Sequence, residues 1–152
     1  MLQPNPLNTL VILIKPWQEA SQEAYLIREQ VFIQEQGVPK DMELDEFDLA
    51  AKHALAYEGP LCVGTGRLVH LDNHHAQIGR MAVLSAFRNQ GIGKAILNHL
   101  IALAQAEGVL RLVLHSQVSV IPFYAKLGFI TQGPVYDEAG IPHRNMMLLL
   151  PQ

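Results

Sequence analysis

Apolar and polar residues alternate along this chain with two periods, one typical of strands and one typical of helices. Residues 9–15 form a β-branched, apolar run that a proline ends, and this pattern predicts a first strand. Over residues 17–36 apolar side chains recur at spacings of three and four, which predicts a helix. Gly37 and Pro39 follow as the expected stop signal. The chain should therefore begin with a strand and a long helix.

Turn signals divide the middle of the chain into shorter elements. Runs 53–57 and 61–70 flank Glu58-Gly59-Pro60 and predict a hairpin, and residues 76–83 predict the next strand. Helical spacing returns over residues 92–107 and stops at Gly108. The acidic segment 41–48 before the hairpin has no regular period, so a solvated loop is its simplest interpretation.

The last third of the chain predicts a buried strand, a short helix and a final strand pair. Residues 110–115 form a continuous apolar run, residues 119–127 a short helix, and residues 130–136 and 144–150 an antiparallel pair. The resulting order β-α-β-β-β-α-β-α-β-β predicts an α/β (α+β) fold with a mixed sheet and helices on its faces. Since no repeat, linker or low-complexity tract divides the sequence, we expect one domain over residues 1–152.

Composition and charge exclude several classes of protein. With 49% hydrophobic and 16% charged residues among 152, the chain should bury a well-packed core. A net charge of −3 and the lack of a Lys/Arg cluster give no case for a nucleic-acid partner. Cys62 is the single cysteine, and no helical His-x-x-x-His pair occurs, so we expect no disulfide and no metal. Apolar runs are too short to span a membrane and no secretion signal precedes them, which favours a cytoplasmic protein.

The stretch Arg88-Asn89-Gln90-Gly91-Ile92-Gly93 is the most informative motif, because it lies between a predicted strand and a predicted helix. A helix N-terminus leaves backbone N–H groups unpaired and carries partial positive charge, so it binds anions. The motif lacks the third glycine of a dinucleotide fingerprint, since position 96 is Ile96, and it lacks the Lys-Ser/Thr pair of a Walker loop. It therefore predicts a phosphorylated ligand of another kind.

Several motifs in order resemble the GNAT superfamily of acyl-CoA-dependent N-acyltransferases. They are Gly79-Arg80-Met81-Ala82-Val83, the loop from Arg88 to Lys94, and Phe123-Tyr124-Ala125-Lys126-Leu127-Gly128-Phe129. Upstream, residues 28–37 and 43–48, with His53 and Arg67, are similar to the ElaA-like branch. The resemblance spans roughly residues 17–150 and implies a mixed sheet of about seven strands, splayed between its fourth and fifth strands and flanked by about four helices.

The resemblance also implies acetyl-CoA as acyl donor and assigns residues to it. The loop amides and Arg88 would bind the pyrophosphate, residues 81–83 would offer backbone groups to the pantetheine arm and the thioester carbonyl, and Gln117 stands where many members carry Asn. The implied cofactor residues are Met81, Ala82, Val83, Arg88, Asn89, Gln90, Gly91, Ile92, Gly93, Lys94, Gln117, Phe123, Tyr124 and Lys126. Residues 81–83 would also read as an ordinary core strand, and the two interpretations can hold together.

Acid and base candidates follow from the chemistry of thioester aminolysis. Tyr124 would protonate the departing thiolate, or would only pack the short helix with its aromatic neighbours. The base that accepts the proton of the amine would be His115 or Glu35, with Glu43, Asp45 and Asp48 following soon after Glu35 in sequence. A water chain could serve any of them. A histidine in a buried strand is also commonly a structural hydrogen-bonding group, so the role of His115 stays open.

Acceptor-site residues are the charged and polar groups around the acidic segment. They comprise Glu35, Glu43, Asp45, His53, Arg67 and Arg80, with His143 as a further lining residue. The acidic members favour a cationic amine as substrate. Arg67 and Arg80 would grip an anionic group, or would pair with Glu43 or Asp45 to fix the loop.

The sequence thus predicts an N-acetyltransferase in which a primary amine of a small molecule or peptide attacks acetyl-CoA directly in a ternary complex. One alternative is a non-catalytic acyl-CoA-binding module with the same fold. Another is an unrelated α/β enzyme that uses the loop for a different phosphate ligand. The apolar final strand would complete the core or pair with a second copy in a homodimer.

Overall fold

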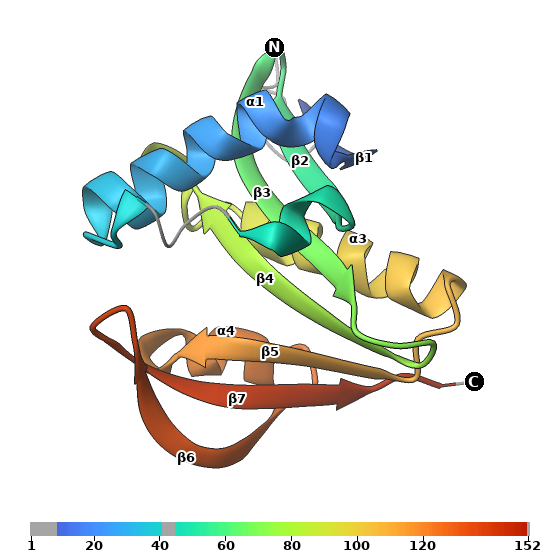
Figure 1. Cartoon of the computed structure of the whole chain (residues 1–152). Coiled ribbons are helices and arrows are strands. Elements are labelled where there is room, and N and C mark those ends of the chain that lie inside the picture. The colour runs from blue at the N-terminus through green and yellow to red at the C-terminus, as the bar shows by residue number, and fades with distance from the viewer. Residues whose placement is uncertain (1–8, 41–44, 152) are drawn as a thin grey trace, which may run out of the picture.

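The computed structural model describes residues 9–40 and 45–151, and its elements follow the order expected from the sequence. Figure 1 shows their arrangement. The elements are β1 Leu10–Pro16, α1 Trp17–Arg28, β2 Lys52–Glu58, β3 Leu61–His70, β4 His75–Val83, α3 Ile92–Ala106, β5 Arg111–Gln117, α4 Ile121–Ala125, β6 Ile130–Glu138 and β7 Ile141–Leu149.

All strands belong to one seven-stranded sheet in the order β1-β2-β3-β4-β5-β7-β6. Neighbouring strands are antiparallel except β4 and β5, which run parallel. In this parallel pair, residues 75–77 of β4 pair with residues 111–113 of β5. Beyond these residues the two strands diverge (Figure 1). The expected mixed sheet, splayed between its fourth and fifth strands, is confirmed.

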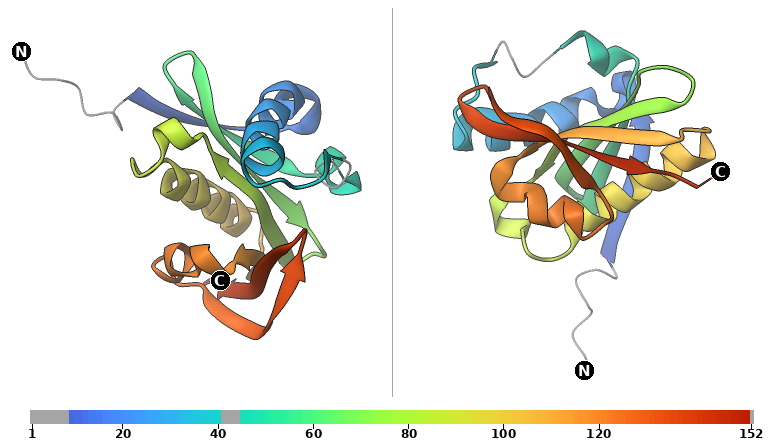
Figure 2. Two further views of the ribbon diagram at one scale, coloured as in Figure 1. Left: turned by 90° about the vertical axis from the view of Figure 1, so that its left-hand side faces the viewer. Right: turned by 90° about the horizontal axis from the view of Figure 1, so that it is seen from below.

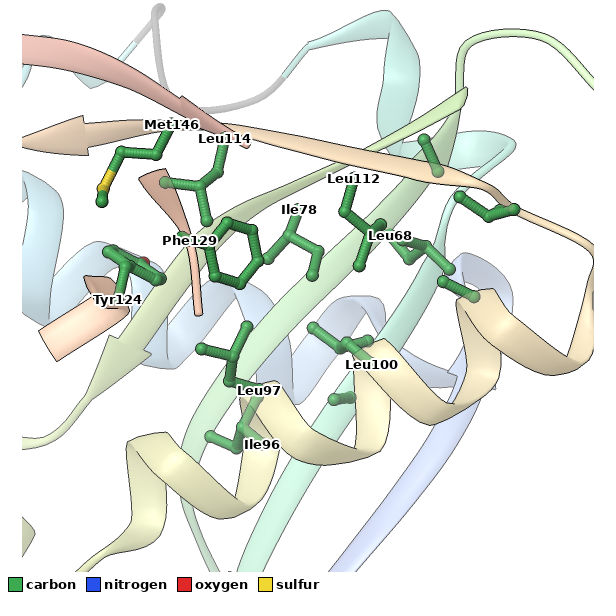
Figure 3. Packing of buried hydrophobic residues seen from close by; sticks show 14 of the residues in the cluster. Leu68, Ile78, Ile96, Leu97, Leu100, Leu112, Leu114, Tyr124, Phe129 and Met146 are labelled. Carbon is green, nitrogen blue, oxygen red and sulfur yellow. The ribbon is translucent and has the colours of Figure 1, made fainter. Parts of the chain in front are cut away.

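Helices cover the two faces of the sheet because the strands alternate apolar residues between them. In β2, Ala54 and Ala56 belong to the main core under α3, whereas Leu55 packs with Ala20 and Ala24 of α1. Figure 2 shows α1 on one face and α3 with α4 on the other. The main core lies between α3 and the strands, where buried leucine and isoleucine side chains interdigitate (Figure 3).

A β-bulge bends β4 just where it leaves β5. Thr65 pairs with Ala82 and Arg67 with Gly79, so Arg80 and Met81 together oppose the single residue Gly66. Arg80 takes a left-handed φ of 51°. A Cβ at position 66 would lie 2.6 Å from the Met81 sulfur and 3.0 and 3.1 Å from the side chains of Ile96 and Leu100, so glycine avoids crowding beneath the bulge.

The first helix differs from its prediction in its last two turns. Residues 17–36 were expected to form one α-helix, but α1 ends at Arg28 and Glu29–Glu35 forms a π-helix. The Gln36 N–H donates to the Val31 carbonyl, five residues back, at 3.1 Å. Apolar spacing alone does not separate this wider turn from an α-helix, since both place residues three to five apart on one face. The predicted glycine stop is present, because Gly37 has a φ of 74°.

The final hairpin is also tighter than expected. Its turn consists of Ala139 and Gly140 alone, with φ of 53° and 79°, and Glu138 pairs with Ile141 directly beside it. These values are those of a two-residue type I′ turn, which matches the twist of the flanking strands. The strands β6 and β7 therefore extend to Glu138 and from Ile141. No described helix is long and apolar enough to cross a membrane.

Candidate active site

A cleft of about 510 Å³ occupies the place where β4 and β5 diverge. Its walls come from the end of the first helix, the bulge of β4, the end of β5, α4 and the β6–β7 hairpin. The polar residues that line it are Gln36, Asp45, Arg67, Gln77, Arg80, His115, Gln117, Tyr124, Glu138 and His143. The splay thus brings residues far apart in sequence around one cavity.

Tyr124 lines this cleft from α4 and is 8% exposed. Its ring lies between the rings of Phe123 and Phe129, whose centroids are 5.0 and 5.9 Å away. Figure 3 shows it beside Phe129 and Leu114 at the edge of the core. Burial raises the pKa of Tyr124 to about 12, so the phenol stays protonated at neutral pH. No hydrogen bond joins its hydroxyl to another described residue, and the group is available to a ligand in the cleft.

His115 lines the cleft from β5, on the face of the sheet opposite the buried Leu114 and Ser116. Its Nδ1 lies 3.3 Å from Oε1 of Glu138. The other carboxylate oxygen of Glu138 lies 3.4 Å from Nε2 of His143, whose Nδ1 lies 2.7 Å from the Ile141 carbonyl oxygen. One carboxylate therefore bridges two histidines at the rim of the cleft.

The opposite wall is a network of arginines and aspartates. Arg28, which is 1% exposed, donates to both oxygens of Asp48 at 2.9 and 3.1 Å. Arg67 donates to Asp48 at 2.8 Å and to both oxygens of Asp45 at 2.7 and 2.8 Å. Arg80 donates to Asp45 at 3.2 Å. The pairing of both cleft arginines with Asp45, one of the sequence alternatives, is present.

These ion pairs set the protonation of the aspartates. Burial by itself would raise the pKa of Asp48, but the hydrogen bonds and charges of Arg28 and Arg67 outweigh it and lower that pKa. Burial of Asp45 is likewise outweighed by Arg67 and then Arg80, which lower its pKa. Both carboxylates are ionised and already engaged by arginines. The acidic segment thus has a structural role at these two positions: Asp45 lines the cleft, and Asp48 is buried outside the lining.

One of the other predicted acceptor-site residues lies away from the cleft, and another falls outside the described part of the chain. His53 is 1% exposed and is absent from the cleft lining; its Nε2 lies 3.0 Å from the Asp48 carbonyl oxygen. Its ring packs against Trp17 at 4.9 Å, and burial lowers the pKa of His53. Glu43 lies outside the residues that the structure describes.

The predicted phosphate loop leads into α3 with a strongly turned backbone. Asn89 and Gly91 have left-handed φ of 64° and 82°, and the N-cap Gly91 supplies no side-chain hydrogen bond to the first turn. The first intrahelical bond runs from the Ala95 N–H to the Gly91 carbonyl. The N–H groups of Ile92, Gly93 and Lys94 precede it and have no partner within the helix. This geometry suits a phosphate.

Arg88, at the start of this loop, is bound to the end of the first helix. Its two terminal nitrogens donate to Oε2 and Oε1 of Glu35 at 2.6 and 2.7 Å, and its Nε donates to the Val83 carbonyl at 2.9 Å. The hydrogen bonds of Arg88 lower the pKa of Glu35. Glu35 is absent from the lining of the main cleft. Glu35, a predicted base, is therefore paired with Arg88, a predicted phosphate-binding residue, outside the cleft that Tyr124 lines.

The remaining predicted cofactor residues lie on β4, at the end of β5 and on or at the end of α4, and only some of them line the cleft. Met81 lines the cleft, and Ala82 and Val83 follow it on β4, beyond the residues that pair with β5. Gln117 lines the cleft at the end of β5, and its Nε2 donates to Oε1 of Gln36 at 2.9 Å. Phe123 contacts Tyr124, and Lys126 caps the end of α4.

Sequence reasoning missed Glu138 and Gln36 as cleft residues. Glu138 lay between the two expected final strands, 130–136 and 144–150, because Asp137-Glu138-Ala139-Gly140 has the composition of a turn. The alternation of β6 would have placed Glu138 on the same face as Tyr136, had the tight turn been foreseen. Gln36 follows the π-helix, whose geometry the apolar spacing does not reveal. Among residues 9–40 and 45–151 no group of His, Cys, Asp and Glu could hold a metal ion.

Comparison with known proteins gives consistent matches over nearly the whole chain. Residues 17–150 match the family model described as an acetyltransferase (GNAT) domain. The Bacillus subtilis protein named as the uncharacterized N-acetyltransferase YjcF is 34% identical over 131 residues, covering 86% of this chain and 93% of that protein.

Two solved structures show the same fold. Escherichia coli ElaA superposes with a TM-score of 0.82 at 24% identity and covers 91% of this chain and 98% of its own. A GNAT family acetyltransferase from Elizabethkingia anophelis, solved with acetyl-CoA bound, gives a TM-score of 0.75 at 19% identity and covers 94% of this chain and 99% of its own.

Proposed function

The chain belongs to the GNAT acetyltransferase family, and from that premise we propose that it transfers the acetyl group of acetyl-CoA to a primary amine of a small molecule or peptide. The observation that carries this proposal is the cleft at the splay, which Tyr124 and His115 both line. A proton donor and a proton acceptor thus share one cavity, as the aminolysis of a thioester requires. An unrelated α/β enzyme is no longer an alternative.

Backbone groups of this chain are suited to bind acetyl-CoA. The free N–H groups at the start of α3 and the left-handed turns at Asn89 and Gly91 form a cradle for the pyrophosphate. Beyond its pairing with β5, the edge of β4 from Met81 to Val83 would offer backbone groups to the pantetheine arm and to the thioester carbonyl oxygen. The Val83 carbonyl is the exception, because it accepts from Nε of Arg88. When bound there, acetyl-CoA supplies an activated thioester. A relative of the same fold was solved with acetyl-CoA bound.

Tyr124 is the proposed general acid. Its phenol is protonated at neutral pH, because burial raises its pKa to about 12. It has no competing hydrogen bond to a described residue, so it can donate to the sulfur as the carbon–sulfur bond breaks. Its aromatic neighbours hold the ring in place.

His115 is the proposed general base, in preference to Glu35. His115 lines the cleft, whereas Glu35 is held by Arg88 outside it and has a lowered pKa. An imidazole can accept a proton from an ammonium group near neutral pH, which an arginine-paired carboxylate does poorly. The substrate ammonium gives one proton to His115, and its nitrogen bonds to the acetyl carbon. A second proton from that nitrogen replaces the one that Tyr124 delivers to the sulfur.

The amine substrate would enter between the β6–β7 hairpin and the opposite wall of the cleft, which Asp45, Arg67 and Arg80 line. Because Asp45 and Asp48 are neutralised by arginines, neither is free to attract an ammonium group. Glu138 is the cleft carboxylate that pairs with histidines rather than arginines. Glu138 would therefore attract a cationic amine to the side of the cleft that holds His115.

Thermal unfolding with a ligand panel tests the cofactor assignment. CoA and acetyl-CoA at about a hundred times their Kd should stabilise the protein by about 2.7 kcal/mol. For a chain of this size that stabilisation corresponds to a Tm increase of roughly 5 to 10 °C. ATP and NAD at equal concentration should give no comparable shift. If saturating CoA left the Tm unchanged, the proposed function would be wrong.

A further inference from the structure

The carboxylate of Glu138 is the only group among the described residues that contacts Nδ1 of His115 through a hydrogen bond, at 3.3 Å. His115 comes from β5 and Glu138 from the end of β6, which is separated from β5 in the sheet by β7. Sheet pairing brings them to one face: His115 pairs with Asn145, and Glu138 lies two residues beyond Tyr136, which pairs with His143. The contact therefore follows from the fold of the whole C-terminal half.

This contact fixes the tautomer of His115. A carboxylate accepts hydrogen bonds and does not donate them, so the proton of a neutral His115 ring resides on Nδ1. Nε2 then carries the lone pair. That nitrogen is the one free to take a proton, since Nδ1 is occupied by Glu138.

The other groups around His115 do not compete for this role. His143 has Nδ1 at 2.7 Å from the Ile141 carbonyl oxygen, and its Nε2 approaches the second oxygen of Glu138. The ring of Tyr136 meets His115 edge-on at 6.0 Å. Across the cleft, Asp45 is engaged by Arg67 and Arg80. Gln117, the next cleft residue on β5, is bonded to Gln36.

We propose that Glu138 is the positioning residue for His115: it holds the imidazole as the Nδ1–H tautomer, directs Nε2 to the acceptor amine and stabilises the imidazolium after proton transfer. This inference rests on the proposed function of the cleft. Glu138 itself neither gains nor loses a proton. It acts through His115, as a carboxylate does in other carboxylate–histidine pairs of hydrolytic enzymes.

The control for this role lies in the same hairpin. Asp137 is adjacent in sequence and points to the turn, where it accepts from the Gly140 N–H at 3.3 Å. Asp137→Asn removes one negative charge from the hairpin and keeps an acceptor for Gly140. Glu138→Gln removes one negative charge at the histidine. Comparison of the two variants separates the contact with His115 from the net charge of the hairpin.

The first readout is the tautomer of His115 in the free protein, measured by long-range ¹H–¹⁵N NMR correlation. Wild type and Asp137→Asn should show the Nδ1–H form at high pH. Glu138→Gln should show a substantial Nε2–H population, because an amide can donate to Nδ1 as well as accept from it. An unchanged Nδ1–H form in Glu138→Gln would overturn the inference. This readout needs neither acetyl-CoA nor a known amine.

The second readout is the pH profile of kcat/KM with a fixed amine. Glu138→Gln should lower kcat/KM by about tenfold or more, with the acid limb moved to lower pH, since a general base contributes about 10²–10⁴-fold. Titration of the amine affects both proteins equally. A difference between the acid limbs of wild type and Glu138→Gln therefore comes from the enzyme. An identical profile in Glu138→Gln would refute the positioning role.

His115→Gln separates failure of this inference from failure of the proposed function. If His115→Gln lost much of its kcat/KM while Glu138→Gln kept the wild-type pH profile, His115 would remain the proposed base and the positioning role of Glu138 would be wrong. No loss in His115→Gln would reject both the base and its positioning residue, while CoA binding would still stand.

Discussion

Glu35 and Arg88 form a two-point ion pair that joins the end of the first helix to the loop before α3, with nitrogen–oxygen distances of 2.6 and 2.7 Å. Both side chains are partly exposed, at 41% and 36%. Sequence reasoning had assigned the carboxylate to catalysis and the guanidinium to phosphate. In the structure each neutralises the other, so the two assignments are coupled.

This coupling predicts that Glu35→Gln strengthens CoA binding. A pyrophosphate that approaches Arg88 must share its guanidinium with Glu35, and an exposed ion pair is worth about 0–1 kcal/mol. Loss of the carboxylate should therefore lower the Kd of CoA by up to about fivefold. Isothermal titration calorimetry at low and high salt measures the change, which salt should diminish.

The matched control for Glu35→Gln is Glu29→Gln in the same π-helix, whose carboxylate contacts Gln34 rather than Arg88. This control should bind CoA as wild type does. Weaker CoA binding in Glu35→Gln would contradict the competition, and would mean that Glu35 orients Arg88 for the phosphate.

Tyr124→Phe should separate chemistry from binding. The phenylalanine ring keeps the packing against Phe123 and Phe129, so the Kd of CoA should change by less than about twofold. Loss of the proton donor should lower kcat by about 10²-fold or more. Equal loss of affinity and rate would show that Tyr124 has only a structural role.

The pH profile of the wild type gives a second test of Tyr124. Its pKa is raised to about 12, so the acid form persists at every lower pH. We therefore expect no loss of kcat from Tyr124 deprotonation between about pH 7 and pH 10. A basic limb in that range that Tyr124→Phe abolishes would contradict the assignment.

Asp48→Asn should destabilise the fold because it leaves Arg28 without its carboxylate. Both side chains are nearly inaccessible, at 3% and 1%, and loss of one partner of a buried pair costs about 3–5 kcal/mol. Chemical denaturation at neutral pH measures the difference. Glu46→Gln, an exposed neighbour, should change stability by less than about 0.5 kcal/mol.

The effect of Asp48→Asn should depend on pH with a definite sign. The pKa of Asp48 is lowered in the folded state, so its ionised form stabilises the protein above the unfolded-state pKa of about 3.9. This contribution is lost as the pH falls below that value toward the folded-state pKa. The stability gap between wild type and Asp48→Asn should narrow over that interval. A constant gap would show that charge is unimportant there.

Ala139→Asn should stabilise the hairpin that carries Glu138. Ala139 has a left-handed φ of 53° at the first position of the turn, a conformation that asparagine tolerates better. We expect a gain of about 0.5 to 1 kcal/mol in the free energy of unfolding. Ala139→Val should lose stability, since a β-branched side chain is strained at positive φ. A gain from both substitutions would exclude backbone conformation as the cause.

The sequence predicted the parts of this structure that depend on local pattern. The glycine stop of the first helix, the order of the elements along the chain and the loop before α3 follow from spacing and turn chemistry. The splay followed from the family resemblance. Tyr124 was predicted from that resemblance and His115 from its place late in the apolar strand, and both line one cleft in the structure.

Other parts depend on side-chain pairings between distant elements. His53 packs its ring against Trp17, and its Nε2 contacts the Asp48 carbonyl oxygen. The residues next to His53 in the sequence do not indicate either contact. Glu35 is engaged by Arg88, which lies 53 residues away in sequence. Glu138 contacts His115 only because the Ala139-Gly140 turn is two residues long. Such contacts are fixed by register rather than by residue type.

Acetyl transfer to an amine is the most direct test of the central claim. Thiol release from acetyl-CoA and mass of the acetylated product would be measured together, over a panel of polyamines, amino sugars, amino acids and peptides. The account predicts amine-dependent release by the wild type, one acetylated amine per thiol, and a rate about 10²-fold lower for Tyr124→Phe at saturating CoA. Tight CoA binding without amine-dependent release for any class in the panel would contradict it, and would favour a non-catalytic acyl-CoA-binding module.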